Sequence, residues 1–170
     1  VSFSYEYLRL VPTERFEKFT LHAGLQMFNY SSLRIFNRYS NSAYNFDNTA
    51  GLGISGKLSQ EYTLWNRLFE TSFTATIPFS VFTIRPSFSY PAPDGFIEHQ
   101  DNYFKAIMQS IEHRSWGSYA GVSTKLQLNY FIKNRNRLFL AYNWYYHHIQ
   151  SLNPVDMAIH SIGAGTSFAF

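Results

Sequence analysis

The sequence contains no cysteine and few charged residues. Only 15% of its 170 residues are Asp, Glu, Lys or Arg, whereas ordinary soluble domains contain about 25%. The absence of cysteine excludes both a disulfide framework and a thiol-based site. The shortage of charge needs an explanation, because a soluble chain of this length requires a charged surface.

Long apolar runs and clusters of positive charge are absent as well. No run approaches the roughly 18 apolar residues of a transmembrane helix, and the mean hydropathy is -0.23. The net charge of +3 is mild and scattered, so no nucleic-acid partner is expected. No signal peptide opens the chain. If the protein is exported, we expect the given sequence to be mature or shortened at its start.

Aromatic residues are abundant, at 19% of the chain, and apolar residues recur with period 2. The clearest example is 16–28, where every second residue is uncharged and the residues between are polar or charged. One face carries Phe19, Leu21, Ala23, Leu25 and Met27, and the other carries Lys18, Thr20, His22, Gly24 and Gln26. Such a separation of two faces predicts a β-strand rather than a helix.

The same alternation predicts about eight strands in a single domain that spans residues 1–170. We expect strands at 1–11, 16–28, 49–64, 67–77, 81–90, 119–132, 138–147 and 157–170, with a tight turn at Pro78-Phe79-Ser80. We interpret 29–48 as a loop; Leu33–Phe36 inside it leaves a count of ten strands open. Pro91–Ser118 is predicted to be irregular, with a short helix within Tyr103–His113.

The two faces of these strands differ in a way that favours a membrane barrel. Charge is nearly absent from the face that carries Phe19, Leu21, Leu25, Leu126, Leu128, Leu140, Tyr142, Trp144, Phe168 and Phe170. The opposite face carries Lys18, His22, Lys57, Glu61, Glu70, Arg85 and Lys125. A charge at mid-depth in lipid costs about 2–4 kcal/mol. We therefore expect the apolar face to contact the lipid bilayer and the polar face to form a network in the barrel lumen. A soluble barrel alternates too, but should carry more charge.

The last stretch, Met157–Phe170, combines an apolar face, a small polar face and a terminal aromatic residue. It resembles the closing strand of small bacterial outer-membrane β-barrel proteins. The resemblance implies an all-β, antiparallel, up-and-down transmembrane β-barrel in the outer membrane of a Gram-negative bacterium. It also implies that Phe170 is an assembly signal for the barrel-assembly machinery and that both termini are periplasmic. Pro91–Ser118 would then lie outside the cell and 29–48 in the periplasm.

Histidines suggest three candidate sites, none of them compelling. His147 and His148 are adjacent on a strand and point to opposite faces, so they are poor joint metal ligands. Glu98, His99, Asp101, Glu112 and His113 match no metal-binding spacing. His160 and Ser161 also point apart, and a catalytic Ser–His pair would have to form across strands. We therefore predict no catalytic residue, no metal site and no cofactor.

The function that we predict is a non-catalytic structural or accessory subunit of a cell-envelope complex. Its partners would be other outer-membrane or periplasmic proteins. Two alternatives stay open. An outer-membrane enzyme acting on lipid or lipopolysaccharide would need a Ser–His–acid cluster at the bilayer rim. A narrow pore would be lined by the lumen charges, although an eight-stranded barrel is just wide enough for side chains to fill it.

Overall fold

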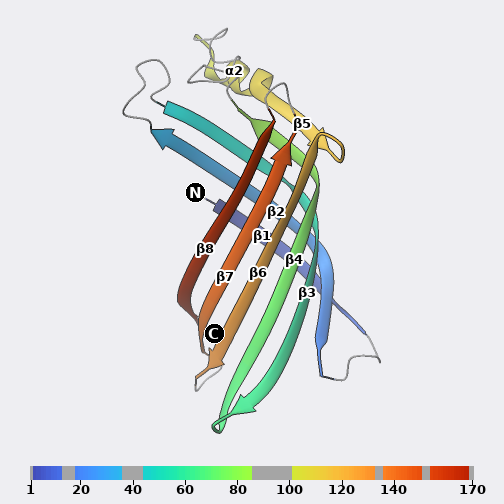
Figure 1. Ribbon diagram of the computed structural model, residues 1–170, viewed down its shortest axis with the longest axis vertical. Coiled ribbons are helices and arrows are strands. Elements are labelled where there is room, and N and C mark those ends of the chain that lie inside the picture. The colour runs from blue at the N-terminus through green and yellow to red at the C-terminus, as the bar shows by residue number, and fades with distance from the viewer. Residues whose placement is uncertain are drawn as a thin grey trace.

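The fold is a single antiparallel β-sheet with one short helix at one end (Figure 1). It is seen in a computed structural model that describes residues 2–12, 18–35, 44–85, 101–132, 136–150 and 154–168. The elements are β1 (Ser2–Val11), β2 (Thr20–Ile35), β3 (Tyr44–Leu64), β4 (Arg67–Ile84), α2 (Tyr103–Ser110), β5 (Ile111–Ser115), β6 (Tyr119–Phe131), β7 (Arg137–Ile149) and β8 (Val155–Ser167). The predicted all-β, antiparallel architecture is confirmed.

The strands follow one another across the sheet in the order β1-β2-β3-β4-β6-β7-β8, while β5 lies off this path and pairs with β4. Each neighbouring pair is antiparallel. Six antiparallel steps therefore separate β1 from β8, so these two strands run in the same direction. The sheet is open, because within the described residues no strand pairs with the outer edge of β1 or of β8.

The two ends of the sheet differ. We call the end that carries α2 the helix end and the end that carries the Trp65-Asn66 turn the turn end (Figure 1). β1 begins at the helix end and β8 finishes at the turn end, so the expectation of both termini on one side is wrong for the described chain. The physical reason is that the path contains an odd number of strands, seven, because β5 lies off it. β2 ends and β3 begins at the helix end, so 29–48 does not connect strands at the turn end.

β4 crosses the whole sheet without a turn at Pro78-Phe79-Ser80, so the turn predicted there is wrong. Leu52 of β3 lies opposite Ser80 and Gly53 lies opposite Pro78, which leaves Phe79 as the extra residue of a β-bulge. A bulge tolerates a proline because no ladder hydrogen bond is required of its nitrogen. It also reverses the alternation, since even-numbered residues are buried up to Pro78 and odd-numbered ones from Val81.

Other boundaries also differ from the prediction. β2 and β3 extend far into 29–48, so most of that predicted loop is strand and Leu33–Ile35 continues β2. The predicted count of eight strands is confirmed. However, two of the predicted strands, 67–77 and 81–90, are represented within the described residues by the single strand β4. The eighth strand is instead β5, which lies in the segment predicted to be irregular. The helix is confirmed as α2, where the Asn102 side chain accepts a hydrogen bond from the Lys105 N–H at 3.1 Å. Residues 86–90 and Phe170 lie outside the described residues.

The distribution of side chains is the reverse of that in a soluble domain. Five hydrophobic residues of the described chain are buried, namely Val81, Ala106, Tyr119, Ala141 and Ile149. Buried polar residues are more numerous and include Gln26, Asp47, Thr49, Ser55, Glu70, Thr76, Asn129 and His147. No described helix has the length and apolar character needed to span a membrane.

The sheet is strongly curled, so that β1 and β2 pass behind β6, β7 and β8 in Figure 1. The Tyr30 ring of β2 lies 6.1 Å from the Tyr145 ring of β7, although β3, β4 and β6 separate these strands along the sheet. Curling gives the sheet a concave face, which holds the buried polar residues, and a convex face, which holds the exposed apolar ones.

Candidate functional site: the two faces of the curled sheet

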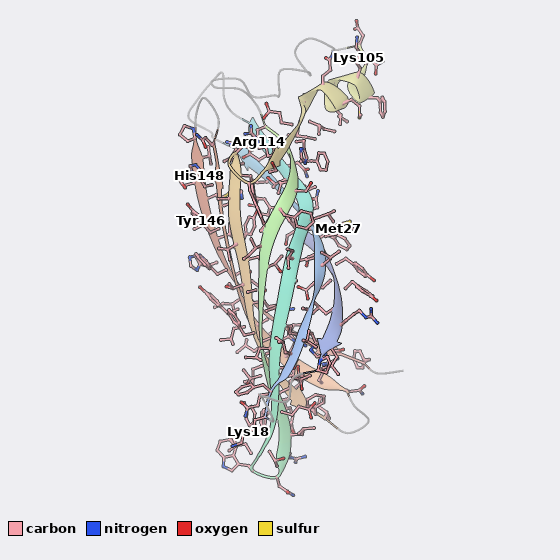
Figure 2. All side chains as sticks on the ribbon, turned by 90° about the vertical axis from the view of Figure 1, so that its right-hand side faces the viewer. Lys18, Met27, Lys105, Arg114, Tyr146 and His148 are labelled. Carbon is pink, nitrogen blue, oxygen red and sulfur yellow. The ribbon has the colours of Figure 1, made fainter. Side chains whose placement is uncertain are left out.

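The convex face carries most of the exposed large hydrophobic side chains of the described sheet. Leu25, Leu126, Leu140 and Phe168 are each 50–62% exposed, and Phe19, Leu128 and Tyr142 are exposed as well. Of the residues predicted for a membrane-facing belt, Leu21 and Trp144 are only partly exposed. In Figure 2, side chains project outward along the strands, and Met27 of β2, another exposed residue, is labelled among them. Monomeric soluble proteins rarely expose contiguous apolar patches of more than a few hundred Å², so this face requires a cover.

Polar groups on the convex face occur in pairs, several of them near the helix end of β7 and β8. The Tyr146 hydroxyl donates to Asp156 at 2.7 Å, and His148 Nδ1 lies 3.0 Å from the same carboxylate. Tyr142 Oη lies 2.6 Å from His160 Nδ1. These pairings satisfy polar groups locally, which lowers the cost of placing them outside water. His147 and His148 point to opposite faces, as predicted for neighbours on one strand.

At the turn end, the concave face holds an ion-pair cluster around Glu70. The Glu70 carboxylate is 3.5 Å from Lys57 Nζ and 3.9 Å from an Arg137 nitrogen, and its side chain is only 10% exposed. A buried carboxylate is tolerated when cations compensate for its lost hydration. Near the helix end Arg85 pairs with Asp47 at 3.2 Å. Charges of both signs therefore occupy the interior of the curl.

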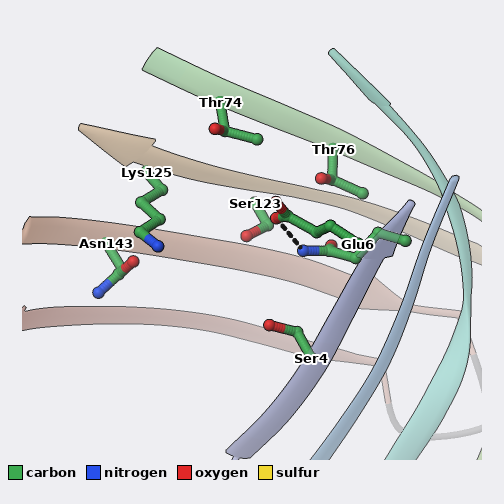
Figure 3. Close-up of a pocket in the computed structure, with 8 residues that line it drawn as sticks. Ser4, Glu6, Thr74, Thr76, Ser123, Lys125 and Asn143 are labelled. Atoms are coloured by element: carbon green, nitrogen blue, oxygen red, sulfur yellow. Dashed lines mark hydrogen bonds between the residues drawn. The ribbon is translucent and has the colours of Figure 1, made fainter. Parts of the chain in front are cut away.

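Between these ion pairs the concave face encloses a polar cavity of about 260 Å³. Its lining includes Ser4 and Glu6 of β1, Thr74 and Thr76 of β4, and Ser123, Lys125 and Asn143 of β6 and β7 (Figure 3). Glu6 lies opposite Gln26 in the β1–β2 ladder and accepts a hydrogen bond from its Nε2 at 2.8 Å. Buried hydroxyls also bond to each other, since Thr76 donates to Ser55 at 3.0 Å.

Toward the helix end the concave face becomes aromatic. Tyr119 and Tyr145 join their hydroxyls at 2.7 Å, and the Tyr145 hydroxyl also lies 3.0 Å from His147 Nδ1. Val81, Tyr119 and Ile149 form a small apolar cluster against which Phe28 packs. A second cavity, of about 320 Å³, shares Ser4, Gln26, Ser123 and Asn143 with the first and continues to Phe28, Tyr30 and Tyr145 beside this cluster.

The residues predicted for a lumen network fall into three groups. Lys57, Glu70 and Arg85 form ion pairs on the concave face, and Lys125 lines its cavity. His22 also lies there, with a buried Nδ1 that has no hydrogen-bond partner among the described residues. Lys18 and Glu61 are exposed near the turn end, where Lys18 precedes β2 (Figure 2).

Further residues contribute to the interior, and two of them, Asp47 and Arg137, were missed from sequence. Glu6 and Gln26, Asp47 and Arg137 all contribute to the polar interior. Glu6 and Gln26 were already on the polar faces of their strands, so alternation was a sufficient signal for them. Asp47 was assigned to the loop 29–48, and Arg137 was placed just before the strand predicted at 138–147. Both lie inside because β3 and β7 are longer than predicted.

No group of three metal-binding side chains occurs within the described residues. Glu112 pairs with Arg114, and His113 Nε2 lies 3.0 Å from the Ser80 hydroxyl, so these loop candidates do not converge. Glu98 and His99 lie outside the described residues. No protein-family model, curated protein or solved structure matches this chain, so its function must be argued from the two faces alone.

Proposed function

We propose that this chain is an integral protein of a bacterial outer membrane, with its convex face against lipid. The single observation that carries the proposal is the inverted side-chain distribution: Leu, Ile and Phe are exposed outside, while Ser, Thr, Gln and paired charges are buried inside. In water this arrangement would expose the apolar area whose burial normally drives folding. In a bilayer the same area is favourably solvated, and the polar groups stay inside.

Strand length supports the same proposal. β6, β7 and β8 each contain 13 residues, and a strand tilted by about 45° needs about 9–11 residues to cross the hydrocarbon core. In this proposal the curled sheet closes into a transmembrane β-barrel, since open edges are not tolerated in lipid.

The role that we propose is that of a non-catalytic structural or accessory subunit of an envelope complex. The concave face supports this role because Lys57, Glu70, Asp47 and Arg85 are engaged in ion pairs. The α2 helix, in which Phe104 is 74% and Met108 55% exposed, provides an exposed apolar surface for contact with other envelope proteins.

Membrane integration is tested by flotation. The purified chain, refolded with phosphatidylethanolamine and phosphatidylglycerol vesicles, should float with the lipid and resist extraction by alkaline carbonate. A chain that stays folded and monodisperse without any amphiphile would contradict the proposal.

The accessory role is tested separately in mild detergent. A larger membrane protein should co-purify with the chain in stoichiometric amount from native membranes. Recovery of the chain as a lone monomer in every mild detergent would contradict that role, while leaving membrane integration intact.

One observation favours the alternative of a lipid-directed enzyme. Ser80 and His113 lie 3.0 Å apart on the convex face, beside the Phe82 ring. A hydrolase also needs a carboxylate that orients the histidine, and among the described residues none bonds to His113. Ser80→Ala should therefore leave the lipid and lipopolysaccharide of expressing cells unchanged by mass spectrometry. A chemical difference that depends on Ser80 would support the enzyme instead.

A further inference from the structure

An apolar groove lies on the convex face near the end of β5. It has a volume of about 540 Å³ and is lined by Leu25 of β2, Ile54 of β3, Phe79 of β4, and Ser115 and Trp116 at and just after the end of β5. Leu25 and Ile54 lie opposite each other in the β2–β3 ladder and are 52% and 55% exposed. The Trp116 indole donates to a β4 carbonyl at 3.0 Å, which holds the ring beside the bulge. Strand pairing thus fixes one wall of the groove and the indole fixes another.

Toward the helix end, the groove ends at the Ser80–His113 pair. Ser115, which lines the groove, lies opposite Ser80 in the β4–β5 ladder, and His113 lies opposite Phe82, farther toward the helix end. Without the extra Phe79 of the bulge, the alternation along β4 would turn Ser80 to the concave face. Bulges re-aim side chains in this way. The convex face therefore presents an apolar groove that is followed by a hydroxyl and an imidazole.

This pair retains one hydrogen-bond donor for a ligand. Ser80 Oγ and His113 Nε2 are 3.0 Å apart, and among the described residues neither side chain has another hydrogen-bond partner. A serine hydroxyl and a neutral imidazole supply one donor each. In either tautomer of His113, one donor is used between the two side chains and the other is left over. A molecule bound here should therefore offer an acceptor, as the ester and phosphate oxygens of a lipid do.

The depth of the pair matches the position of those oxygens in a bilayer. Lys125 is the central residue of β6 and lies opposite Thr74 of β4, and Ser80 follows Thr74 by six residues toward the helix end. At about 3.4 Å per residue and a tilt of about 45°, these six residues span about 14 Å of depth. Half of the hydrocarbon core is about 15 Å. In the proposed bilayer, Ser80 therefore lies near the boundary of the hydrocarbon, and the groove lies between that boundary and the centre.

We propose that the groove holds one acyl chain of a resident glycerophospholipid, whose ester or phosphate oxygen accepts a hydrogen bond from the Ser80–His113 pair. The inference rests on the proposed function, because the bilayer is what brings such lipids to the convex face. A lipid in the leaflet at the helix end has its tail toward the bilayer centre and its head toward the helix end. The groove and the polar pair follow each other in the same order.

The charge around the groove favours a glycerophospholipid over lipopolysaccharide. Lipopolysaccharide carries several phosphates, which are best neutralised by several cations. The arginine of β5, Arg114, bonds to Glu112 and to the Thr83 hydroxyl. Thr83 is buried on the concave face, so this guanidinium is directed away from the groove. A single neutral donor suits one ester or one phosphate oxygen.

Native mass spectrometry tests the groove. The full chain is floated with phosphatidylglycerol vesicles and extracted into a mild detergent, and one phosphatidylglycerol should remain on most molecules. Leu25→Trp fills the groove and should lower the retained fraction at least about 5-fold, because the indole would occupy the place of the acyl chain. Leu140→Trp is the matched control, since Leu140 lies on the convex face with 53% exposure and does not line the groove. It should retain the lipid as the unmodified chain does.

A titration in the same detergent tests the polar end. The lipid-depleted chain is titrated with phosphatidylglycerol, and the bound fraction gives an apparent Kd. Ser80→Ala and His113→Leu should each change this Kd by less than about 2-fold, because one donor remains in either variant. The double variant, which has neither donor, should raise the Kd by about 5–10-fold, as expected for the loss of a hydrogen bond to a lipid oxygen.

Four results would overturn the proposal. A floated chain could retain no lipid, or Leu25→Trp and Leu140→Trp could retain equal amounts. Ser80→Ala alone could weaken binding as much as the double variant does. Finally, purified lipopolysaccharide could displace phosphatidylglycerol at an equal or lower concentration, which would assign the groove to that lipid. A chain that does not float refutes the proposed function itself, so the two failures are distinguishable.

Discussion

Leu126 is half exposed near the middle of β6, on the convex face, and Ile132 lies just beyond the end of the same strand with 43% exposure. In water, an arginine at either position would be harmless and would improve solubility. In lipid, its cost depends on depth, from about 2–4 kcal/mol at the midplane to about 0–1 kcal/mol near the interface.

We expect Leu126→Arg to lower the free energy of unfolding by about 2–4 kcal/mol in lipid vesicles, and Ile132→Arg by about 0–1 kcal/mol. Urea titration followed by tryptophan fluorescence measures both values. Equal and negligible effects of the two substitutions would mean that water covers the convex face.

Glu70 provides a residue-scale test of the concave face. We expect Glu70→Gln to lower the free energy of unfolding by about 2 kcal/mol, because Lys57 and Arg137 would lose their shared anion. Glu61 lies directly opposite Glu70 in the β3–β4 ladder but is exposed. Glu61→Gln is therefore the matched control, and it should be neutral or slightly stabilising, since it removes a like charge. A larger loss for Glu61→Gln would contradict the assigned ion-pair cluster.

At the scale of the element, period 2 was sufficient to predict most strands and the face of nearly every residue in them. The period-2 pattern failed at Pro78-Phe79-Ser80. There the alternation reverses next to a proline, which is compatible with either a turn or a bulge. A turn and a bulge both reverse the pattern, and only pairing with Leu52 and Gly53 across the ladder distinguishes them. The full length of β2 and β3 was missed for a related reason, since their polar ends alternate too weakly to signal a strand.

Two glycines test how closely the strands approach each other. A Cβ at Gly24 of β2 would lie 1.9 Å from the Tyr7 carbonyl oxygen of β1, whereas a Cβ at Gly163 of β8 would meet nothing within 4 Å. We expect Gly24→Ala to lower the free energy of unfolding by about 1–3 kcal/mol. Gly163→Ala should change it by less than about 0.5 kcal/mol. Chemical denaturation in detergent micelles measures both, and a tolerated Gly24→Ala would show that β1 is not held as closely as described.

At the scale of the whole molecule, the direction of β1 relative to β8 could not be predicted from the sequence. The relative direction depends on whether the number of strands along the path is odd or even. Interpreting the bulge at Phe79 as a turn adds one strand and therefore reverses the expected direction. The interior ion pairs were partly predictable, because Glu70 and Lys57 share a polar face. The approach of Arg137 to Glu70 depends on how far the sheet curls, which no local pattern specifies.

The two ends of the molecule should lie on opposite sides of the bilayer. Met108 of α2 is 55% exposed at the helix end, and Arg67 is exposed beside the turn at the other end. In sealed vesicles with uniform insertion, a membrane-impermeant maleimide should label only one of Met108→Cys and Arg67→Cys. Both should react once detergent is added. Labelling of both in intact vesicles would mean that the chain does not cross the membrane.

The chain has three tryptophans, at positions 65, 116 and 144. Trp65 is 85% exposed at the turn end, Trp116 is 68% exposed and donates to the Pro78 carbonyl, and Trp144 stacks on Tyr146 on the convex side of β7. In the proposed bilayer, Trp65 at the turn end and Trp144 within β7 should therefore lie at different depths. Quenchers placed at known positions along a lipid tail could read the vertical position of the molecule from its own emission, without any attached dye.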